Sequence, residues 1–155
     1  MKAMIFDIDG TLADVTHLTH MLGAFPKAGE SYVEYEEYHK LAVHAPVVAW
    51  VVDMARAASK INYRIFLATS RRTTFMTETV QFLELNNIPC DMMFMRDPSD
   101  DRSATDLKRD VLSRIRRLGY TVEQAFDDDP EVITMWESEG IEAFLVEGHG
   151  FDYGE

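Results

Sequence analysis

Short apolar runs alternate with amphipathic segments along almost the whole chain, and this alternation limits the folds that it can adopt. Five runs have the length and composition of strands, at residues 3–9, 63–69, 91–96, 122–126 and 142–146. Between them, the spacing of apolar residues predicts helices over residues 47–60, 73–86, 105–118 and 130–139. Strands that alternate with helices form a mainly parallel sheet through right-handed crossovers. We therefore expect an α/β fold, a five-stranded sheet with helices on both faces.

Residues with known preferences mark the ends of these helices. Pro46 suits the first turn of the helix at 47–60. Thr105 is expected to cap the helix at 105–118, and Gly119 to end it. The tail beyond Gly148 is expected to be a loose end.

The first strand runs directly into Asp7-Ile8-Asp9-Gly10-Thr11. In an extended strand, residues two apart point to the same side. Two carboxylates on one side repel each other, so a cation or a shared chemical task would relieve the arrangement. Gly10 would let the chain turn sharply and let a ligand approach the backbone. The alternative is a strand that ends in a solvated, Asp-rich turn, and a short motif leaves that alternative open.

Polar residues also follow the other predicted strands. Thr69, Ser70 and Arg71 end the second strand, Asp127, Asp128 and Asp129 end the fourth, and Lys108 lies near the start of the helix after the third. Parallel sheets bind ligands outside the carboxyl ends of their strands, where the strand order reverses. These residues are therefore expected to meet at one site, which makes the solvated-turn interpretation much weaker.

The residue types at this site suit phosphoryl transfer. Carboxylates with a backbone carbonyl and waters favour a hard cation such as Mg²⁺, and no His/Cys cluster favours zinc. Lys108 and Thr69 would supply donors for phosphoryl oxygens. An aspartate can accept the group as an aspartyl-phosphate, while a second aspartate protonates the leaving alkoxide and then deprotonates water.

The constellation resembles the haloacid dehalogenase superfamily of phosphotransferases. The matching residues are the run from Asp7 to Thr11, Thr69, Lys108 and the pair Asp127–Asp128. The resemblance implies a three-layer, Rossmann-like fold. It also implies Asp7 as nucleophile and metal ligand, and Asp9 as acid/base and metal ligand through its backbone carbonyl. Thr69 and Lys108 would then bind the transferring group, and Asp127 or Asp128 would complete the metal site. The second aspartate points to phosphatases and disfavours dehalogenases.

A narrower resemblance is to the 3′-phosphatase domains of bacteriophage polynucleotide kinases. It is carried by the residue stretches 44–48, 67–71 and 127–136. Arg71 stands where that family has an arginine that helps to bind substrate. The residues expected to contact substrate are Gly10, Thr11, Ser70, Arg71 and Arg72.

Two departures from the narrower family matter. Ser70 stands where glycine is usual, and Asp129 stands where the phage enzyme has arginine. The second departure removes a positive charge near the site and weakens the case for polynucleotide binding. The chain contains no G-x-x-x-x-G-K-[S/T] sequence, so 5′-kinase activity is not expected.

Residues 13–45 are expected to form a small cap, which would leave the site open to the end of a polymer. Tyr32, Tyr35 and Tyr38 recur at helical spacing within this segment. The stripe could stack on bases. Packing of the helix onto the domain is the favoured interpretation, because aromatic side chains most often supply buried area.

Length and composition set broader limits. The 155 residues are expected to form one domain over 1–155. The single cysteine, Cys90, favours a reducing compartment, so we expect a cytoplasmic protein, in the host cytoplasm if it is phage-encoded. No apolar run is long enough to span a bilayer. The net charge of −12 argues against broad adhesion to nucleic acid or anionic membrane.

Further charged residues could border the site. Arg72, Arg96, Arg102 and Arg109 could bind additional phosphates, although solvated charge is the favoured interpretation for most of them. Asp106 and Asp110 lie close enough along the helix to pair with Lys108. The histidines show no metal-ligand pattern.

The sequence thus predicts a Mg²⁺-dependent phosphatase that removes 3′-phosphate from DNA or RNA ends. A phosphatase for nucleoside monophosphates or sugar phosphates is the alternative, and a non-catalytic binding module is a remote one. The negative net charge favours the small substrate, while the short cap and the narrower resemblance favour the polynucleotide end. The sequence indicates no protein partner.

Overall fold

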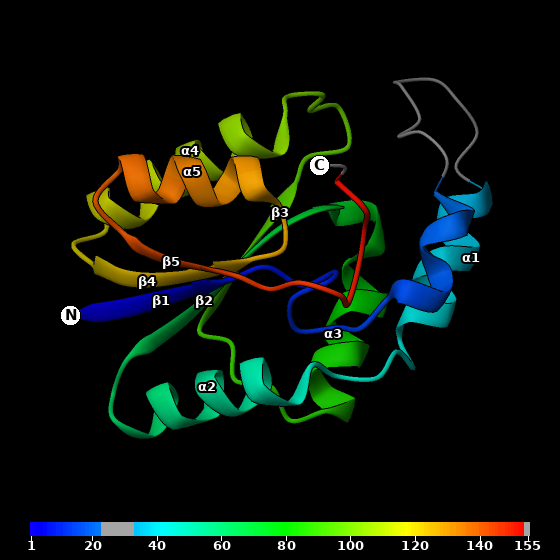
Figure 1. Cartoon of the computed structure of the whole chain (residues 1–155), viewed down its shortest axis with the longest axis horizontal. Helices are drawn as coiled ribbons and strands as arrows, with labels where there is room; N and C mark the ends of the chain where they lie inside the picture. The colour runs from blue at the N-terminus through cyan, green and yellow to red at the C-terminus, as the bar shows by residue number, and fades with distance from the viewer. Residues whose placement is uncertain (23–32, 154–155) are drawn as a thin grey trace.

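The computed structural model describes residues 1–22 and 33–153, and its centre is a five-stranded, fully parallel sheet (Figure 1). The strands are β1 (Lys2–Phe6), β2 (Arg64–Arg72), β3 (Met92–Arg96), β4 (Thr121–Asp127) and β5 (Glu142–Leu145). They lie in the order β3-β2-β1-β4-β5. The strand order reverses at β1, where the chain leaves first toward β2 and later returns to β4. The expected α/β architecture is confirmed.

Helices cover both faces of this sheet. They are α2 (Ala49–Lys60), α3 (Met76–Leu85), α4 (Ala104–Arg117) and α5 (Pro130–Ser138). In Figure 1, α4 and α5 lie above the sheet, and α2 and α3 lie below it. The 3-10 helix η1 (Thr16–Met21), α1 (Val33–Ala42) and the 3-10 helix η2 (Thr73–Phe75) complete the elements. The helix α1 stands beyond the end of β1 rather than over a face of the sheet (Figure 1).

The core consists of two apolar layers because successive side chains of a strand point to opposite faces. Ile5 packs into the layer beneath α4 and α5, together with the buried Trp136. Phe6 packs into the other layer with Val52 of α2. Its ring stacks on Phe126 of β4 with a centroid distance of 4.7 Å. This packing fixes the ends of β1 and β4 side by side.

Several element ends differ from the sequence prediction. β1 ends at Phe6, before the aspartates, and β2 continues to Arg72. The cap of α4 is Ser103 and not Thr105, because the Ser103 hydroxyl accepts a hydrogen bond from the Asp106 backbone N–H at 3.1 Å. Thr105 lies inside the first turn, where its side chain cannot act as the N-cap.

The prediction of a loose end beyond Gly148 is wrong for the described part of that tail. The His149 carbonyl accepts a hydrogen bond from the Val15 backbone N–H at 2.9 Å. The His149 ring also lies 3.0 Å from the Asp14 carboxylate. These contacts tie the tail to the segment that follows β1. No helix among the described residues is long and apolar enough to cross a membrane.

Candidate active site

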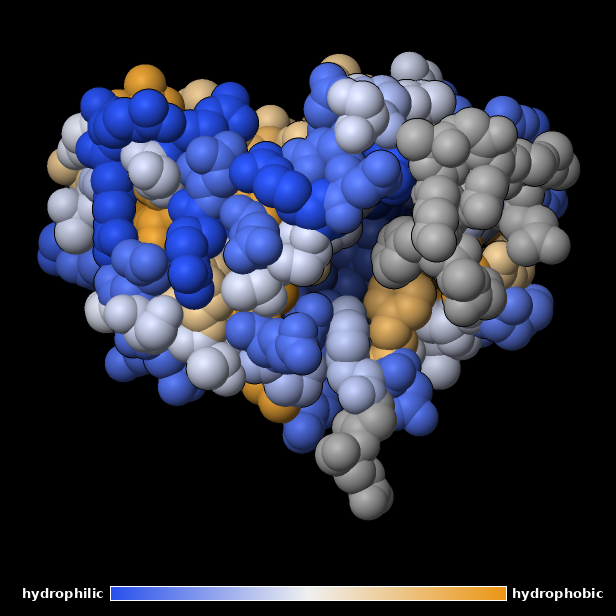
Figure 2. Space-filling model, turned by 90° about the horizontal axis from the view of Figure 1, so that it is seen from above, coloured by the Kyte–Doolittle hydropathy of each residue, from blue (hydrophilic) through white to orange (hydrophobic). Residues whose placement is uncertain are grey.

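The polar residues that follow β1, β2 and β4 meet at the carboxyl edge of the sheet, where the strand order reverses. A cavity of about 700 Å³ opens there. Figure 2 looks down from the top of Figure 1 and shows a hollow bordered largely by hydrophilic side chains. Among the predicted site residues, the cavity is lined by Asp7, Asp9, Thr69, Ser70, Arg71, Arg72, Lys108, Asp127 and Asp128. The expected convergence of these segments is therefore present.

Lys108 joins the ends of β1 and β4. Its Nζ donates hydrogen bonds to Asp7 Oδ1 at 3.1 Å and to Asp127 Oδ2 at 2.6 Å. All three side chains are buried. Lys108 reaches them because α4 begins at the same edge of the sheet. The predicted pairing of Lys108 with Asp106 or Asp110 is not found; Asp106 lies at the helix cap and Asp110 approaches an arginine.

Asp128 is the third carboxylate of this group. Among the described residues its Oδ2 is buried without a hydrogen-bond partner. Gly10 makes room for it: Gly10 has a φ of +81°, and a Cβ there would lie 2.2 Å from Asp128 Oδ2. Only glycine fits a position that is both left-handed and this crowded. The motif glycine therefore shapes the acidic cluster.

The acidic cluster of Asp7, Asp127 and Asp128 is suited to a cation. One carboxylate oxygen from each residue lies within 4.8 Å of the others. Burial, together with the charge of Asp127, raises the pKa of Asp7 to about 7. Burial and the charges of Asp7 and Asp127 raise the pKa of Asp128 to about 10. Lys108 offsets only one of the negative charges, so a hard divalent cation fits the donors and the unpartnered Oδ2.

Asp9 points to a different set of partners. Arg71 Nε and Nη2 donate to its two carboxylate oxygens at 2.8 and 2.7 Å, and the Tyr38 hydroxyl donates to Oδ1 at 2.7 Å. Burial alone would raise the pKa of Asp9, but the Arg71 guanidinium lowers it to about 2. β1 ends before both aspartates, so strand alternation does not orient them, although both line the same cavity. The Asp9 side chain is outside the acidic cluster.

The two threonines of the predicted site, Thr11 and Thr69, are both buried. Thr11 Oγ1 donates to Asp7 Oδ2 at a long 3.4 Å. Thr69 Oγ1 accepts a hydrogen bond from the Arg71 backbone N–H at 3.0 Å. This hydrogen bond lies within the last part of β2, where it joins Thr69 on the cavity wall to the residue whose side chain binds Asp9.

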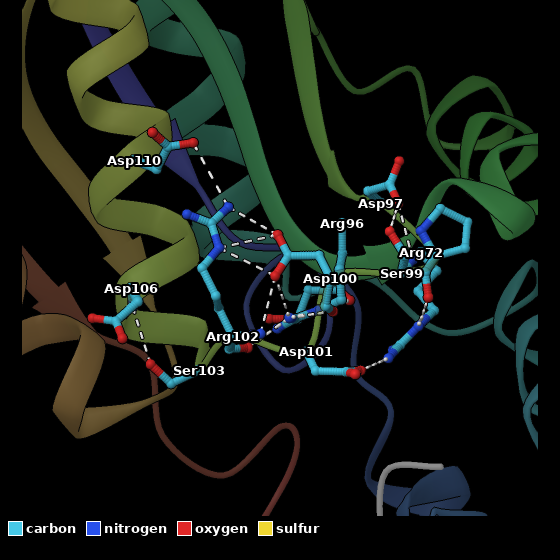
Figure 3. A network of polar contacts seen from close by, with 12 residues as sticks. Arg72, Arg96, Asp97, Ser99, Asp100, Asp101, Arg102, Ser103, Asp106 and Asp110 are labelled. Carbon is cyan, nitrogen blue, oxygen red and sulfur yellow. Dashed lines mark hydrogen bonds and ion pairs between the residues drawn. The ribbon is translucent and has the colours of Figure 1, made fainter. Parts of the chain in front are cut away.

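A network of arginines and aspartates forms the wall between β2, β3 and α4 (Figure 3). Arg72 Nη2 lies 3.3 Å from Asp101 Oδ1. Arg96 donates to the carbonyl oxygens of Ser70 and Arg102 at 3.2 and 2.6 Å. These contacts tie the loop before α4 to the end of β2. Arg72 and Arg96 border the cavity through groups that already hold the loop together.

The two other arginines that were predicted to border the site, Arg102 and Arg109, also have acidic partners. Arg102 pairs with Asp100 at 2.8 Å and approaches Asp110 at 3.7 Å (Figure 3). Arg109 lies 3.8 Å from Glu139 and is not among the residues that line the cavity.

Two further segments line the cavity: the expected cap, which sequence reasoning had placed near the site, and the tail, which it had not. Tyr38 and His39 come from α1, and Phe151 and Tyr153 come from the tail. The tyrosine spacing identified the stripe but not its contact with Asp9. Tyr35 is 7% exposed and Tyr38 1% exposed, which leaves little ring surface for a base and agrees with packing. Tyr32 lies outside the described residues.

Comparison with known proteins identifies the family of this constellation. A family model for the phosphatase domain of polynucleotide kinase PNKP matches residues 1–151. The chain belongs to this family. It is therefore a phosphatase domain of the haloacid dehalogenase type, as the sequence motifs suggested.

Solved structures agree with this family. A chain in the structure of a Pnkp1/Rnl/Hen1 complex is 25% identical with a TM-score of 0.76; the match covers 97% of this chain and 47% of that one. The haloacid dehalogenase-like hydrolase SP0104 from Streptococcus pneumoniae is 18% identical with a TM-score of 0.65, and the match covers 96% and 86%. A putative β-phosphoglucomutase from Thermotoga maritima is 19% identical with a TM-score of 0.68, covering 100% and 89%. The last two show the shared fold, and the chain spans about half of the chain that it matches in the Pnkp1/Rnl/Hen1 complex.

Proposed function

We propose that the chain is a Mg²⁺-dependent phosphatase that removes 3′-phosphate from the ends of DNA or RNA. The observation that carries the proposal is the pairing of Lys108 with Asp7 and Asp127 beside Asp128, in a chain of this family. A buried ammonium next to a carboxylate nucleophile suits a phosphoryl group, whose oxygens carry negative charge during transfer.

The proposed reaction has two halves. In the first, a carboxylate oxygen of Asp7 bonds to phosphorus, the ester P–O bond breaks, and Asp9 gives its proton to the departing 3′ oxygen. In the second, Asp9 takes a proton from water, the water oxygen bonds to phosphorus, and the bond to Asp7 breaks. Both aspartates return to their starting states.

The other site residues bind and orient the phosphoryl group in this proposal. Lys108 and the Thr69 hydroxyl donate to its oxygens, and Arg71 contributes charge from the opposite wall. The remaining proposed substrate contacts are Gly10, Thr11, Ser70 and Arg72. Asp7, Asp127 and Asp128, with the backbone carbonyl of Asp9, would hold the Mg²⁺, which supplies positive charge for the phosphoryl oxygens when bound.

The proposal treats 1–155 as one domain with a small cap at about 13–45. The described part of this segment supports a limited cover, because α1 forms one wall of the cavity through Tyr38 and His39. A cap of this size suits a substrate that enters by its end.

A phosphatase for small metabolites is the second candidate, and a specific observation favours it. The arginines of the cavity wall already pair with carboxylates or carbonyls, as Arg72 does with Asp101. The chain also carries a net charge of −12. Neither feature attracts a long polyanion at a distance.

Rates on three substrates distinguish the candidates. We would compare phosphate release from a 3′-phosphorylated oligonucleotide, a 3′-mononucleotide and a 5′-mononucleotide, each with Mg²⁺ and with EDTA. The proposal predicts fastest release from the oligonucleotide and loss of release in EDTA. Equal or faster release from the 5′-mononucleotide would contradict the proposed end specificity.

The nucleophile is tested separately. Asp7→Asn should abolish phosphate release with every substrate while circular dichroism shows an intact fold. Asp53→Asn, an exposed change on α2, is the matched control and should leave release unchanged. Unchanged turnover in Asp7→Asn would refute the assignment of Asp7.

A further inference from the structure

The carboxylate of Asp9 is held from two directions by residues of different elements. Arg71, at the end of β2, binds both oxygens, with Nε on Oδ2 at 2.8 Å and Nη2 on Oδ1 at 2.7 Å. Tyr38 of α1, 29 residues from Asp9 in the chain, donates its hydroxyl to Oδ1 alone at 2.7 Å. Arg71 therefore occupies both carboxylate oxygens, whereas Tyr38 leaves Oδ2 accessible.

Tyr38 is a rigid holder because α1 is docked on the residues that follow β2. The ring of His39 stacks on Phe75 with a centroid distance of 3.9 Å and an interplanar angle of 3°. His39 Nδ1 also lies 2.6 Å from the Tyr35 carbonyl oxygen. The Tyr38 side chain is 1% exposed, so its hydroxyl has little freedom to turn away from Asp9.

Arg71 has competing tasks. Its Nη1 donates to Thr79 Oγ1 at 3.0 Å, and that hydroxyl donates to the Phe75 carbonyl at 2.8 Å. This contact anchors the guanidinium on the cavity wall, where it meets the proposed substrate phosphoryl group. A phosphoryl dianion attracts the same N–H groups that hold Asp9. When Nε and Nη2 of the anchored guanidinium donate to substrate, the Tyr38 hydroxyl is the side-chain hydrogen bond, among the described residues, that still orients Asp9.

We propose that Tyr38 is a positioning residue for the proton transfer made by Asp9. Its hydroxyl occupies Oδ1, so Oδ2 is the oxygen that gives the proton to the leaving alkoxide and later takes one from water. The inference rests on the proposed phosphatase function and adds that α1 takes part in the chemistry by orienting the acid.

Two substrates with different leaving groups distinguish a positioning role of Tyr38 from a purely structural one. An alkoxide needs a proton as it departs, whereas p-nitrophenolate departs readily without one. Tyr38→Phe keeps the ring and removes only the hydroxyl. We expect kcat on a 3′-phosphorylated oligonucleotide to fall about tenfold to hundredfold. This loss is part of the roughly 10²–10⁴-fold rate enhancement that general acid catalysis contributes. We expect KM to stay the same and kcat on p-nitrophenyl phosphate to change less than about threefold.

Tyr63→Phe is the matched control. Its hydroxyl also donates to a carboxylate, Glu123 Oε2 at 2.5 Å, but Tyr63 lies directly before β2 and is not among the residues that line the cavity. The control should leave the ratio of kcat for the two substrates unchanged. Because both rates come from one enzyme sample, the ratio does not depend on the fraction of Tyr38→Phe that is folded.

Equal losses on both substrates, or no loss on either, would overturn the positioning role. This outcome is distinct from a failure of the proposed end specificity. If the wild-type chain prefers a 5′-mononucleotide, that alkyl ester replaces the oligonucleotide, and the same ratio still tests Tyr38. If the wild-type chain releases phosphate from p-nitrophenyl phosphate but from neither alkyl ester, both the proposed function and the role of Tyr38 are refuted.

Discussion

Replacing Asp128 by asparagine should stabilise the metal-free protein and at the same time weaken its binding of Mg²⁺. Asp128 is a buried carboxylate beside Asp7 and Asp127, and among the described residues Lys108 donates its hydrogen bonds to those two neighbours and not to Asp128. Asparagine has nearly the same shape without the charge. The substitution therefore removes repulsion within the acidic cluster while preserving its packing.

The expected gain follows from the separation of the charges. For carboxylate oxygens within 4.8 Å, Coulomb's law with an effective dielectric constant of about 20 gives about 3.5 kcal/mol per pair. Asp128 has two such neighbours, and Lys108 offsets roughly one of them. An amide whose N–H groups lack full partners costs about 1 kcal/mol. Near neutral pH the folded wild type avoids this repulsion by keeping Asp128 protonated, as its raised pKa indicates, and holding that proton costs a similar few kcal/mol. After the cost of the amide, we expect the free energy of unfolding to rise by about 2 kcal/mol near neutral pH.

The gain in stability from Asp128→Asn should increase as pH rises. The pKa of Asp128 is raised from 3.8 to about 10, so the folded state holds this proton more tightly than the unfolded state does. A group of this kind destabilises the protein increasingly as pH rises above its unfolded pKa. The advantage of Asp128→Asn should thus vanish near pH 4 and grow toward pH 7, where linkage limits it to about 4 kcal/mol.

Urea unfolding in EDTA at about pH 4 and about pH 7.5 measures this difference. Asp129→Asn is the matched control, because Asp129 caps α5 through its side chain and asparagine caps equally well. Added Mg²⁺ should then stabilise the wild type more than Asp128→Asn. A variant that is less stable than the wild type in EDTA at about pH 7.5, or that gains as much from Mg²⁺, would refute the description of the cluster as a repulsive cation site.

Three further predictions concern neighbouring residues. Gly10→Ala should lower the free energy of unfolding by at least about 2 kcal/mol and reduce activity, since its Cβ would strike Asp128; Gly119→Ala, with a φ of +93° and no atom within 4 Å of its Cβ, should cost about 1 kcal/mol in the same urea assay. Lys108→Met should destabilise the protein by about 3–5 kcal/mol in EDTA, with partial recovery in Mg²⁺, and an equal loss in both buffers would contradict its role. Burial lowers the pKa of His39 from 6.5 to about 4, so charging it opposes folding and stability should fall as pH drops from about 6.5 to 4; His39→Phe should flatten that part of the pH–stability curve, and an unchanged slope would argue against it.

The convergence of the site could be predicted from the sequence because it depends on topology. Once β1, β2 and β4 are parallel neighbours, the residues that follow them must meet at one edge of the sheet. Asp7, Thr69 and Asp127 line one cavity for this reason. Apolar periodicity also located the sheet and its covering helices.

The partners of each side chain could not be predicted in the same way. Asp7 and Asp9 have different partners, and strand alternation says nothing about them because β1 ends at Phe6, one residue before the first aspartate. The contact between Tyr38 and Asp9 joins α1 to the end of β1, and helical spacing alone does not specify what a helix packs against. The contacts of His149 with Asp14 likewise arise from the path of the tail, which no periodic pattern encodes.

The environments of the two motif aspartates explain how one pair of identical side chains can take unequal parts. Burial and the charge of Asp127 raise the pKa of Asp7 to about 7, whereas Arg71 overcomes the effect of burial and lowers the pKa of Asp9 to about 2. The proposed chemistry needs the reverse, a charged nucleophile and a protonated acid. A cation among the carboxylates would lower the pKa of Asp7, and a phosphoryl group that attracts Arg71 would raise that of Asp9. On this argument the two ligands together, and neither alone, bring both aspartates to their working protonation states, so we expect turnover to need the cation even for esters that leave without a proton.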